Sequence, residues 1–290
     1  IAWYLVPISP NIPVIPRLKL FTLEASHYSF WLVPLLIYFY SKVLFEKSRK
    51  SYVLAFILTI SLLLSFSIGV IGGLLISFIP VLILYFRNIF PVSGQRVLFF
   101  ISLGALPLLI LLAYHFYPDN ALFARIRNIF KGDDTSARGR TYEAFILAHK
   151  IAAQKSLLWG VGPGQLKLIG RETVIRFYGF ANPPAVVRLP NASAETLAYF
   201  GYTGLVGRLL IELLLFFKTR VMENPYRLWL FAFVFIYQFT GSYITNLAEY
   251  LVWLLAFSSA FPQFDKEPWK NALLYENKQY KKVYTNSQQP

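Results

Sequence analysis

Long apolar runs separated by short polar connectors dominate this sequence. Apolar runs of about 18 residues or more are long enough to cross a bilayer as helices. The apolar stretch around Ser65-Phe66-Ser67 is too long for one crossing, so a tight hairpin is expected at these residues. We predict about seven spans, at residues 28–45, 51–64, 68–86, 97–114, 196–217, 228–244 and 250–261. The pattern predicts an all-α fold, a polytopic membrane helix bundle.

One long segment interrupts this pattern, because no window between residues 115 and 195 stays apolar enough to cross a bilayer. Within it, Ala144, Leu147 and Ile151 recur at helical spacing, and Thr141–Trp159 is expected to form an amphipathic helix. The chain is therefore expected to have four parts: an N-terminal transmembrane part at 1–114, a large extracytoplasmic loop at 115–195, a C-terminal transmembrane part at 196–262 and a cytoplasmic tail at 263–290.

The first twenty residues contain a proline at every third position from Pro7 to Pro16. Each proline removes a backbone donor, so residues 1–20 are expected to form an extended loop. The stretch is too broken by proline to be a signal peptide or a complete span. Because the chain also begins with Ile1 rather than methionine, we expect that a further N-terminal portion precedes it.

The composition agrees with a membrane protein, since 56% of the residues are hydrophobic, 14% are charged and the mean hydropathy is +0.50. The net charge of +14 comes without the basic and aromatic motifs of nucleic-acid-binding modules, so nucleic acid is excluded as a partner. The short connectors 46–50, 87–96 and 218–227 are basic. This bias predicts that they and the tail face the cytoplasm, and that the long loop lies on the opposite side.

Cysteine and histidine exclude several kinds of chemistry. No cysteine is present, which excludes thiol catalysis, cysteine-ligated metals and disulfides. The three histidines, His27, His115 and His149, share no metal-ligand spacing, so no metal site is predicted and no cofactor is expected. Candidate chemistry must therefore come mainly from the charged residues.

The long loop concentrates positive charge, because residues 115–194 hold eleven basic and five acidic residues, a net charge of +6. Such a surface attracts anions. Arg138 and Arg140 are the strongest candidates, because Asp133 and Asp134 supply N-cap residues for the helix that follows. The arginines are then expected in the first helical turn, where the helix dipole and bidentate guanidinium groups favour phosphate. The alternative is that both arginines pair with the two aspartates.

Two further features have a structural and a functional interpretation. The glycines of WGVGPG, residues 159–164, resemble a phosphate loop, but the Gly-Lys-Ser/Thr ending is missing and no strand precedes them. They are interpreted as a helix stop followed by a tight turn. In the fifth predicted span, Arg208 and Glu212 have the spacing of an ion pair on one helix face. Charges inside a span are functional candidates, and structural pairing accounts for them equally well.

Four separated segments form an ordered set of motifs. An arginine followed by a Glu-Ala-Ser element opens the first span at residues 17–28, and a serine-containing turn follows at 64–67. In the long loop an arginine precedes a helix and a Gly-x-Gly turn at 136–164, and NASAE at 191–195 runs into a helix with Gly-x-x-Gly-Leu. In this order the motifs resemble the O-antigen polymerase and ligase superfamily, the Wzy-type membrane glycosyltransferases of the GT-C kind.

The match is not complete. Arg140 occupies the position of the family's loop arginine, with Arg138 as its neighbour. Ile68 stands where an arginine often follows the serine turn, and Pro190 stands where ligases in particular carry a histidine. The second departure favours a polymerase over a ligase. Family members usually have more spans than the seven predicted here, which agrees with a missing N-terminal part.

The resemblance implies a bacterial surface-polysaccharide polymerase, a multi-pass protein of the inner membrane whose long loop is catalytic and faces the periplasm. It implies transfer of an undecaprenyl-pyrophosphate-linked glycan onto an acceptor glycan at the lipid bilayer, with a chain-length regulator protein as a further candidate partner. Arg140 and Arg17, assisted by Arg138, are expected to bind the pyrophosphate without a metal, because developing negative charge suits preorganised arginines.

The group that orients or deprotonates the acceptor hydroxyl is expected to be Glu195, as the first candidate, with Glu24, Glu249 and His149 as alternatives. Further candidate substrate-binding residues are Asn191, Glu24, His149 and Glu249. The alternatives are an O-antigen ligase that transfers glycan to a lipid A core, and a transporter or flippase of an anionic lipid-linked solute that uses Arg208 and the basic loop. A non-catalytic membrane scaffold is the last alternative.

Overall fold

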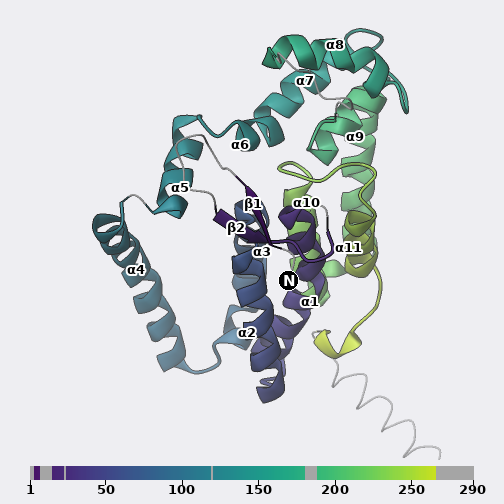
Figure 1. Ribbon diagram of the computed structural model, residues 1–290. Coiled ribbons are helices and arrows are strands. Elements are labelled where there is room, and N and C mark those ends of the chain that lie inside the picture. Colours follow the sequence, from purple (N-terminus) through teal and green to yellow (C-terminus); the bar gives the residue numbers. More distant parts are fainter. Residues whose placement is uncertain (1–2, 7–14, 23, 119, 180–187, 266–290) are drawn as a thin grey trace, which may run out of the picture.

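The computed structural model describes residues 3–6, 15–22, 24–118, 120–179 and 188–265. In these residues the chain folds mainly into helices, with a two-stranded sheet near the N-terminus (Figure 1). The elements are β1 (Trp3–Val6), β2 (Ile15–Leu18), α1 (Ala25–Phe45), α2 (Arg49–Leu64), α3 (Ile68–Ile89), α4 (Ser93–Phe116), α5 (Ala121–Lys131), α6 (Thr135–Arg140), α7 (Tyr142–Ala152), α8 (Leu166–Tyr178), α9 (Ala192–Lys218), η1 (Val221–Glu223), α10 (Pro225–Tyr237), α11 (Leu247–Phe257) and η2 (Pro262–Phe264).

Four of the described helices, α1, α3, α4 and α9, are long and apolar enough to cross a membrane. This agrees with a helical membrane protein, but the count is lower than the seven spans predicted. α2 has 16 residues, and α10 and α11 have 13 and 11. At about 1.5 Å per residue, α10 and α11 reach only about 20 Å and 16 Å, against roughly 30 Å for the apolar core of a bilayer. The sixth predicted span is too long because the loop 238–246 follows the end of α10 at Tyr237, and the seventh extends past the end of α11 at Phe257.

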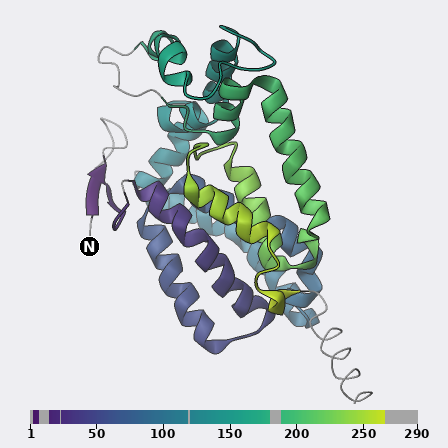
Figure 2. The same ribbon diagram turned by 90° about the vertical axis from the view of Figure 1, so that its right-hand side faces the viewer.

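The bundle is built around α10, which is largely apolar and is buried among α1, α3 and α11 (Figures 1 and 2). Gly73 of α3 faces the ring of Phe233. Trp229 lies against Phe78 with 4.5 Å between the ring centroids, and its indole N–H donates to the Leu74 carbonyl over 3.2 Å. These contacts fix α10 against α3 and give the short helix its place in the core.

α4 stands apart from this bundle in Figure 1, and none of its side chains is buried. Aromatic pairs connect it near its two ends. The ring of Phe99 lies 4.9 Å from that of Phe90, and the ring of Tyr114 lies 5.5 Å from that of Phe123, measured between centroids. Because α4 is apolar on all faces, the lipid of a bilayer can cover the side chains against which no protein packs.

The N-terminal segment differs from the extended loop that the prolines predict. β1 and β2 form an antiparallel pair in which Trp3 lies opposite Leu18 and Leu5 lies opposite Pro16. A two-stranded sheet leaves both strands at an edge, where a proline without an N–H is tolerated. Pro7, Pro10 and Pro13, like most of the predicted tail at 263–290, lie outside the described residues. The all-α prediction thus holds for the bundle and misses this small sheet.

The described residues between α4 and α9 form four helices, α5 to α8, and so confirm that the loop contains helices. Its main helix ends earlier than predicted. α7 stops at Ala152 and turns continue to Trp159, because the chain turns there to meet α9. Leu147 and Ile151 of α7 are buried together with Leu197 of α9, so this contact forms a second apolar core outside the bundle.

The glycine turn after α7 packs into a break in α9. Gly201 has φ 66° and ψ −166° inside α9, which frees two backbone N–H groups. Those of Tyr202 and Thr203 donate to the carbonyls of Leu157 and Leu158 over 2.9 Å and 3.2 Å. Gly160 has φ 68°, so the interpretation of the glycines as a tight turn is confirmed. Their interpretation as a helix stop is wrong, because α7 already ends at Ala152. The N–H groups freed by the break in α9 and the carbonyl groups of the turn therefore form hydrogen bonds with one another.

We expect Gly201→Ala to destabilise the protein by about 2 kcal/mol or more, because an alanine there has an unfavourable φ and its Cβ meets backbone. That Cβ would lie 2.2 Å from the Leu158 carbonyl oxygen. Thermal unfolding of the detergent-purified protein measures the effect. Gly207→Ala on the same helix is the matched control, since a Cβ there meets nothing within 4 Å. Equal stability of the two variants would contradict the prediction.

Candidate functional site: an arginine cavity at the end of the bundle

Arginines from three separate segments line one cavity of about 320 Å³. Arg17 comes from β2, Arg125 from α5 and Arg140 from the end of α6. The lining also includes the glycine-rich start of α3, with Gly69 and Gly72. The cavity therefore combines cationic and apolar lining residues.

Arg17 is fixed by the turn between α2 and α3. Its Nε donates to the Ser65 carbonyl over 2.9 Å, and Nη2 donates to the Ser67 hydroxyl over 3.3 Å. Phe66 in this turn has φ 49°, as a sharp reversal requires, and the Ser29 hydroxyl donates to the Ser65 hydroxyl over 2.6 Å. The predicted tight hairpin at Ser65 is confirmed, and the turn carries the arginine of β2.

Arg140 lies at the C-terminal end of a short helix, not in the first turn of a long one as predicted. The backbone breaks at Thr141, with φ −112° and ψ −113°, and separates α6 from α7. The side-chain amide of Asn191 donates to the Arg140 carbonyl over 2.8 Å and to the Phe239 carbonyl over 2.6 Å. Asn191 also caps α9 by accepting from the Ala194 N–H. Buried Asn191 therefore holds the backbone of Arg140 against the bundle.

Arg138 forms an ion pair with Glu143 at 2.9 Å and donates to the Gly132 carbonyl over 3.1 Å. The alternative that Asp133 and Asp134 neutralise the two arginines is wrong for the contacts described. Asp134 instead accepts from the Ala137 N–H, as the predicted N-cap, and pairs with Arg125 at 3.5 Å. Arg138 thus stabilises the junction of α6 and α7 next to the cavity.

Two tyrosines outside the spanning helices have perturbed acidity. Burial and the nearby carboxylate of Glu143 raise the pKa of Tyr178 to about 12. Burial also raises the pKa of Tyr243, against the opposing effect of the Arg140 charge. Both phenols therefore stay protonated at neutral pH and can serve as neutral hydrogen-bond donors.

Glu24 is the acidic residue nearest to the guanidinium of Arg140, with 3.9 Å between Oε2 and Nη2. It precedes α1, lines the cavity and is half exposed. Ser26 donates to the same carboxylate oxygen over 3.0 Å. A smaller pocket lined by His27 and Tyr243 adjoins the Arg140 and Glu24 pair. Of the predicted site residues, Arg17, Arg140 and Glu24 therefore lie around one cavity.

Three other predicted site residues do not line this cavity. Glu195 is buried on α9 and accepts from the Ile244 N–H over 2.7 Å. His149 pairs with the hydroxyl of Tyr202 at 2.9 Å on the exposed side of α7. Glu249 of α11 is buried and pairs with Arg208 of α9. Their catalytic or binding roles stay predictions, while their positions separate them from the arginines.

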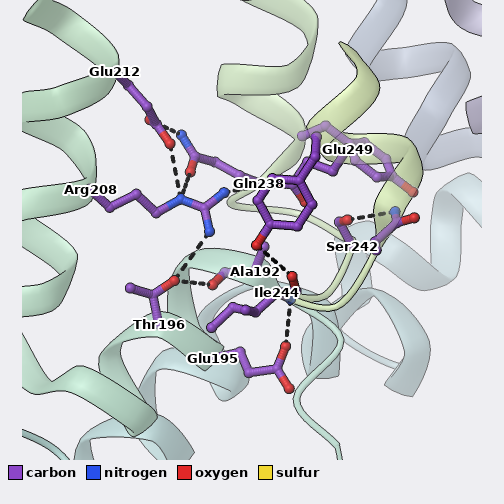
Figure 3. A network of polar contacts seen from close by, with 12 residues as sticks. Ala192, Glu195, Thr196, Arg208, Glu212, Gln238, Ser242, Ile244 and Glu249 are labelled. Carbon is purple, nitrogen blue, oxygen red and sulfur yellow. Dashed lines mark hydrogen bonds and ion pairs between the residues drawn. The ribbon is translucent and has the colours of Figure 1, made fainter. Parts of the chain in front are cut away.

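The predicted pair of Arg208 and Glu212 is confirmed, and it belongs to a larger polar cluster inside the bundle (Figure 3). Arg208 Nε lies 2.9 Å from Glu212 Oε1 and 2.8 Å from Gln238 Oε1, and Nη2 pairs with Glu249. An apolar groove of about 850 Å³ between α9 and α11 exposes one side of this cluster. The groove is larger than the arginine cavity, but its one cation is already paired, so it offers less to an anion.

Sequence reasoning missed Arg125, Tyr237 and Thr240 of the cavity. Arg125 is one of eleven basic residues in its segment, and no local pattern distinguishes it from the others. Tyr237 and Thr240 lie within the sixth predicted span at 228–244, where no extramembrane site was expected. In the described residues, no group of three or more histidine and acidic side chains could hold a metal ion.

We expect Asn191→Ala to release α6, because the residue contributes both the cap of α9 and the hold on Arg140. A lost cap costs about 1 kcal/mol, and the two unsatisfied carbonyls add to it. Limited trypsin digestion with mass spectrometry should then find faster cleavage after Arg138 and Arg140. Asn246→Ala is the control, since Asn246 caps α11 and donates to Ser242. Unchanged cleavage in Asn191→Ala would contradict the hold.

The arginine cavity has the chemistry of an anion site, because guanidinium groups bind phosphate oxygens in bidentate fashion and keep their charge at any physiological pH. Its apolar wall on α3 suits a ligand with an apolar part next to its charge. In comparisons with known proteins, the chain matches no protein-family model and no curated protein.

Proposed function

We propose that this protein is a membrane glycosyltransferase of the O-antigen polymerase type, which transfers an undecaprenyl-pyrophosphate-linked glycan onto an acceptor glycan. The observation that carries the proposal is the meeting of Arg17 and Arg140 in one cavity, although 123 positions separate them in the sequence. The motif resemblance named both residues. Their convergence is what a shared pyrophosphate site requires.

In the proposed reaction the leaving group is the lipid diphosphate, on which negative charge develops as the glycosidic bond breaks. Arg17 and Arg140 stabilise this charge, and Arg125 adds a third cation at the same cavity. Because these side chains are held by backbone carbonyls, a hydroxyl and carboxylates, little reorganisation is needed at the moment of reaction. Arg138 assists by holding the junction of α6 and α7.

The acceptor hydroxyl needs a carboxylate to orient it or to take its proton. Glu24 is now the best placed candidate, because it lines the cavity beside Arg140 and is half exposed. In the proposal a donor diphosphate takes the place of Glu24 at the guanidinium and leaves the carboxylate for the acceptor. Glu195, the first candidate from the sequence, does not line the cavity, and its carboxylate accepts a hydrogen bond from the Ile244 N–H.

The lipid chain of the donor is proposed to leave the cavity along α3. Gly69 and Gly72 line the cavity, and a Cβ at either would meet no atom within 4 Å. This side of α3 therefore leaves room for a chain next to the arginines. The ligase alternative uses the same donor and stays open. The transporter alternative is less favoured, because Arg208 is balanced by Glu212 and Glu249 rather than free for a solute.

We expect Arg140→Ala to lower polymer formation at least about 100-fold, which is the usual effect of removing a charge-stabilising donor. Arg140→Lys is also expected to be impaired, because an ammonium lacks the bidentate fork. Electrophoresis of glycans formed by purified protein in liposomes measures this. Arg176→Ala is the control, since Arg176 is exposed and pairs with Glu172 far along α8. Normal polymer length from Arg140→Ala would refute the role.

Arg17→Ala tests the second arginine in the same assay, with the same expected loss. Because Arg17 also holds the Ser65 turn, the thermal stability of the variant must be measured beside its activity. Loss of activity with intact folding supports an arginine clamp, in which Arg17 and Arg140 together bind the pyrophosphate. Full activity in a folded Arg17→Ala variant would exclude Arg17 from this clamp.

Gly72→Leu tests the proposed path of the lipid chain. The new side chain should fill the cavity wall and lower polymer formation, while the fold stays stable because the position is helical and open. Gly104→Leu on α4 is the matched control, because a Cβ there also meets nothing within 4 Å and Gly104 does not line the cavity. Equal activities of the two variants would contradict the path and leave the arginine clamp to its own test.

A further inference from the structure

A buried cluster inside the bundle contains one cation and two carboxyl groups. Arg208 and Glu212 project from α9, Glu249 projects from α11, and Gln238 follows α10 (Figure 3). Glu212 is 6% exposed and Glu249 is 2% exposed. The cluster is independent of the arginine cavity, and nothing in the proposed glycosyl transfer uses it.

Glu212 has the environment of an ionised carboxylate. Its Oε1 accepts from Arg208 Nε over 2.9 Å, and its Oε2 accepts from the Gln238 side-chain amide over 2.7 Å. The amide of Gln238 has one orientation that serves both partners, since its oxygen accepts from the same Arg208 Nε. Both carboxylate oxygens of Glu212 therefore have donors.

Glu249 differs. Its Oε1 accepts from Arg208 Nη2, whereas its Oε2 is buried and has no hydrogen-bond partner in the described structure. A buried carboxylate oxygen without a donor is costly, particularly in apolar surroundings. Protonation lowers this cost, because a neutral carboxyl group is less expensive to bury than a charged carboxylate.

The groups around the cluster do not neutralise its excess negative charge. One guanidinium faces two carboxyl groups, which leaves a net charge of −1 if both are ionised. Further ionisable groups that interact electrostatically with the cluster are Glu195 on α9, Tyr250 on α11 and Tyr237 on α10, and none of these three is a cation. Arg188 lies near Glu195 and packs over Tyr243. A net charge inside a membrane bundle is expensive.

We infer that the Arg208, Glu212 and Glu249 cluster is a proton-binding site, which holds one proton at neutral pH and is then neutral. A proton on either carboxyl group balances the charge of the cluster against its one guanidinium. Tyr237, which lines the arginine cavity, lies within electrostatic reach of Glu249, although none of the cluster residues lines that cavity. The apolar groove lined by Arg208 and Glu212 makes the cluster accessible to apolar reagents.

Infrared spectroscopy of the purified protein in nanodiscs tests this inference. At neutral pH the wild type should show the carbonyl band of a protonated carboxyl group in an apolar environment. Glu249→Gln and Glu212→Gln should each remove it, because the remaining carboxylate then balances Arg208. Glu172→Gln is the matched control, since Glu172 also pairs with an arginine four residues away but is exposed. It should leave the band unchanged.

Absence of the band from the wild type would overturn the inference, as would its persistence in both cluster variants. Glu195→Gln assigns a persisting band to the other buried carboxyl group of α9. If either cluster variant fails to fold, the wild type is treated with an apolar carbodiimide, which modifies protonated carboxyl groups. Mass spectrometry should then find modified Glu212 or Glu249 at neutral pH and much less modification at high pH. A wild type modified at neither residue would also overturn the inference.

Discussion

Polar groups inside an apolar bundle must be satisfied by the protein itself, because the bilayer offers no partners. α9 shows how this constraint organises the molecule. Its backbone opens at Gly201, and the freed N–H groups of Tyr202 and Thr203 are taken by carbonyls of the turn after α7. Hydrogen bonds that neither segment could make alone thereby connect the turn after α7 to α9, one of the candidate membrane-spanning helices.

A second connection follows from the same constraint. The start of α9 pairs with the loop after α10, where Ala192 and Ser193 donate to the carbonyls of Gly241 and Gln238. Asn191 extends this contact to Arg140. The two short helices α10 and α11 therefore do not merely fill the core. The loop between them positions the arginine that faces β2 across the cavity.

The arginine cavity and the apolar groove differ in how their charges are matched. The arginine cavity gathers cations that are partly exposed and held mainly by carbonyls and distant carboxylates, so an anionic group can still approach them. The apolar groove exposes a cation whose donors already meet Glu212, Glu249, Gln238 and Thr196. Volume alone would favour the groove as the site. The chemistry of an anionic substrate favours the smaller cavity, and the groove cluster has the different character of a proton site.

The sequence by itself determined the helical membrane character, the turn at Ser65, the glycine turn before α8 and the pairing of Arg208 with Glu212, because each depends on neighbours close in the sequence. It did not determine where the last two apolar runs break, since α10 is apolar whether it spans a bilayer or is buried in protein. Nor did it separate Arg125 from ten other basic residues, or reveal that Glu195 and Glu249 lie away from the arginines. Those outcomes depend on contacts between segments far apart in the chain, which only the tertiary structure decides.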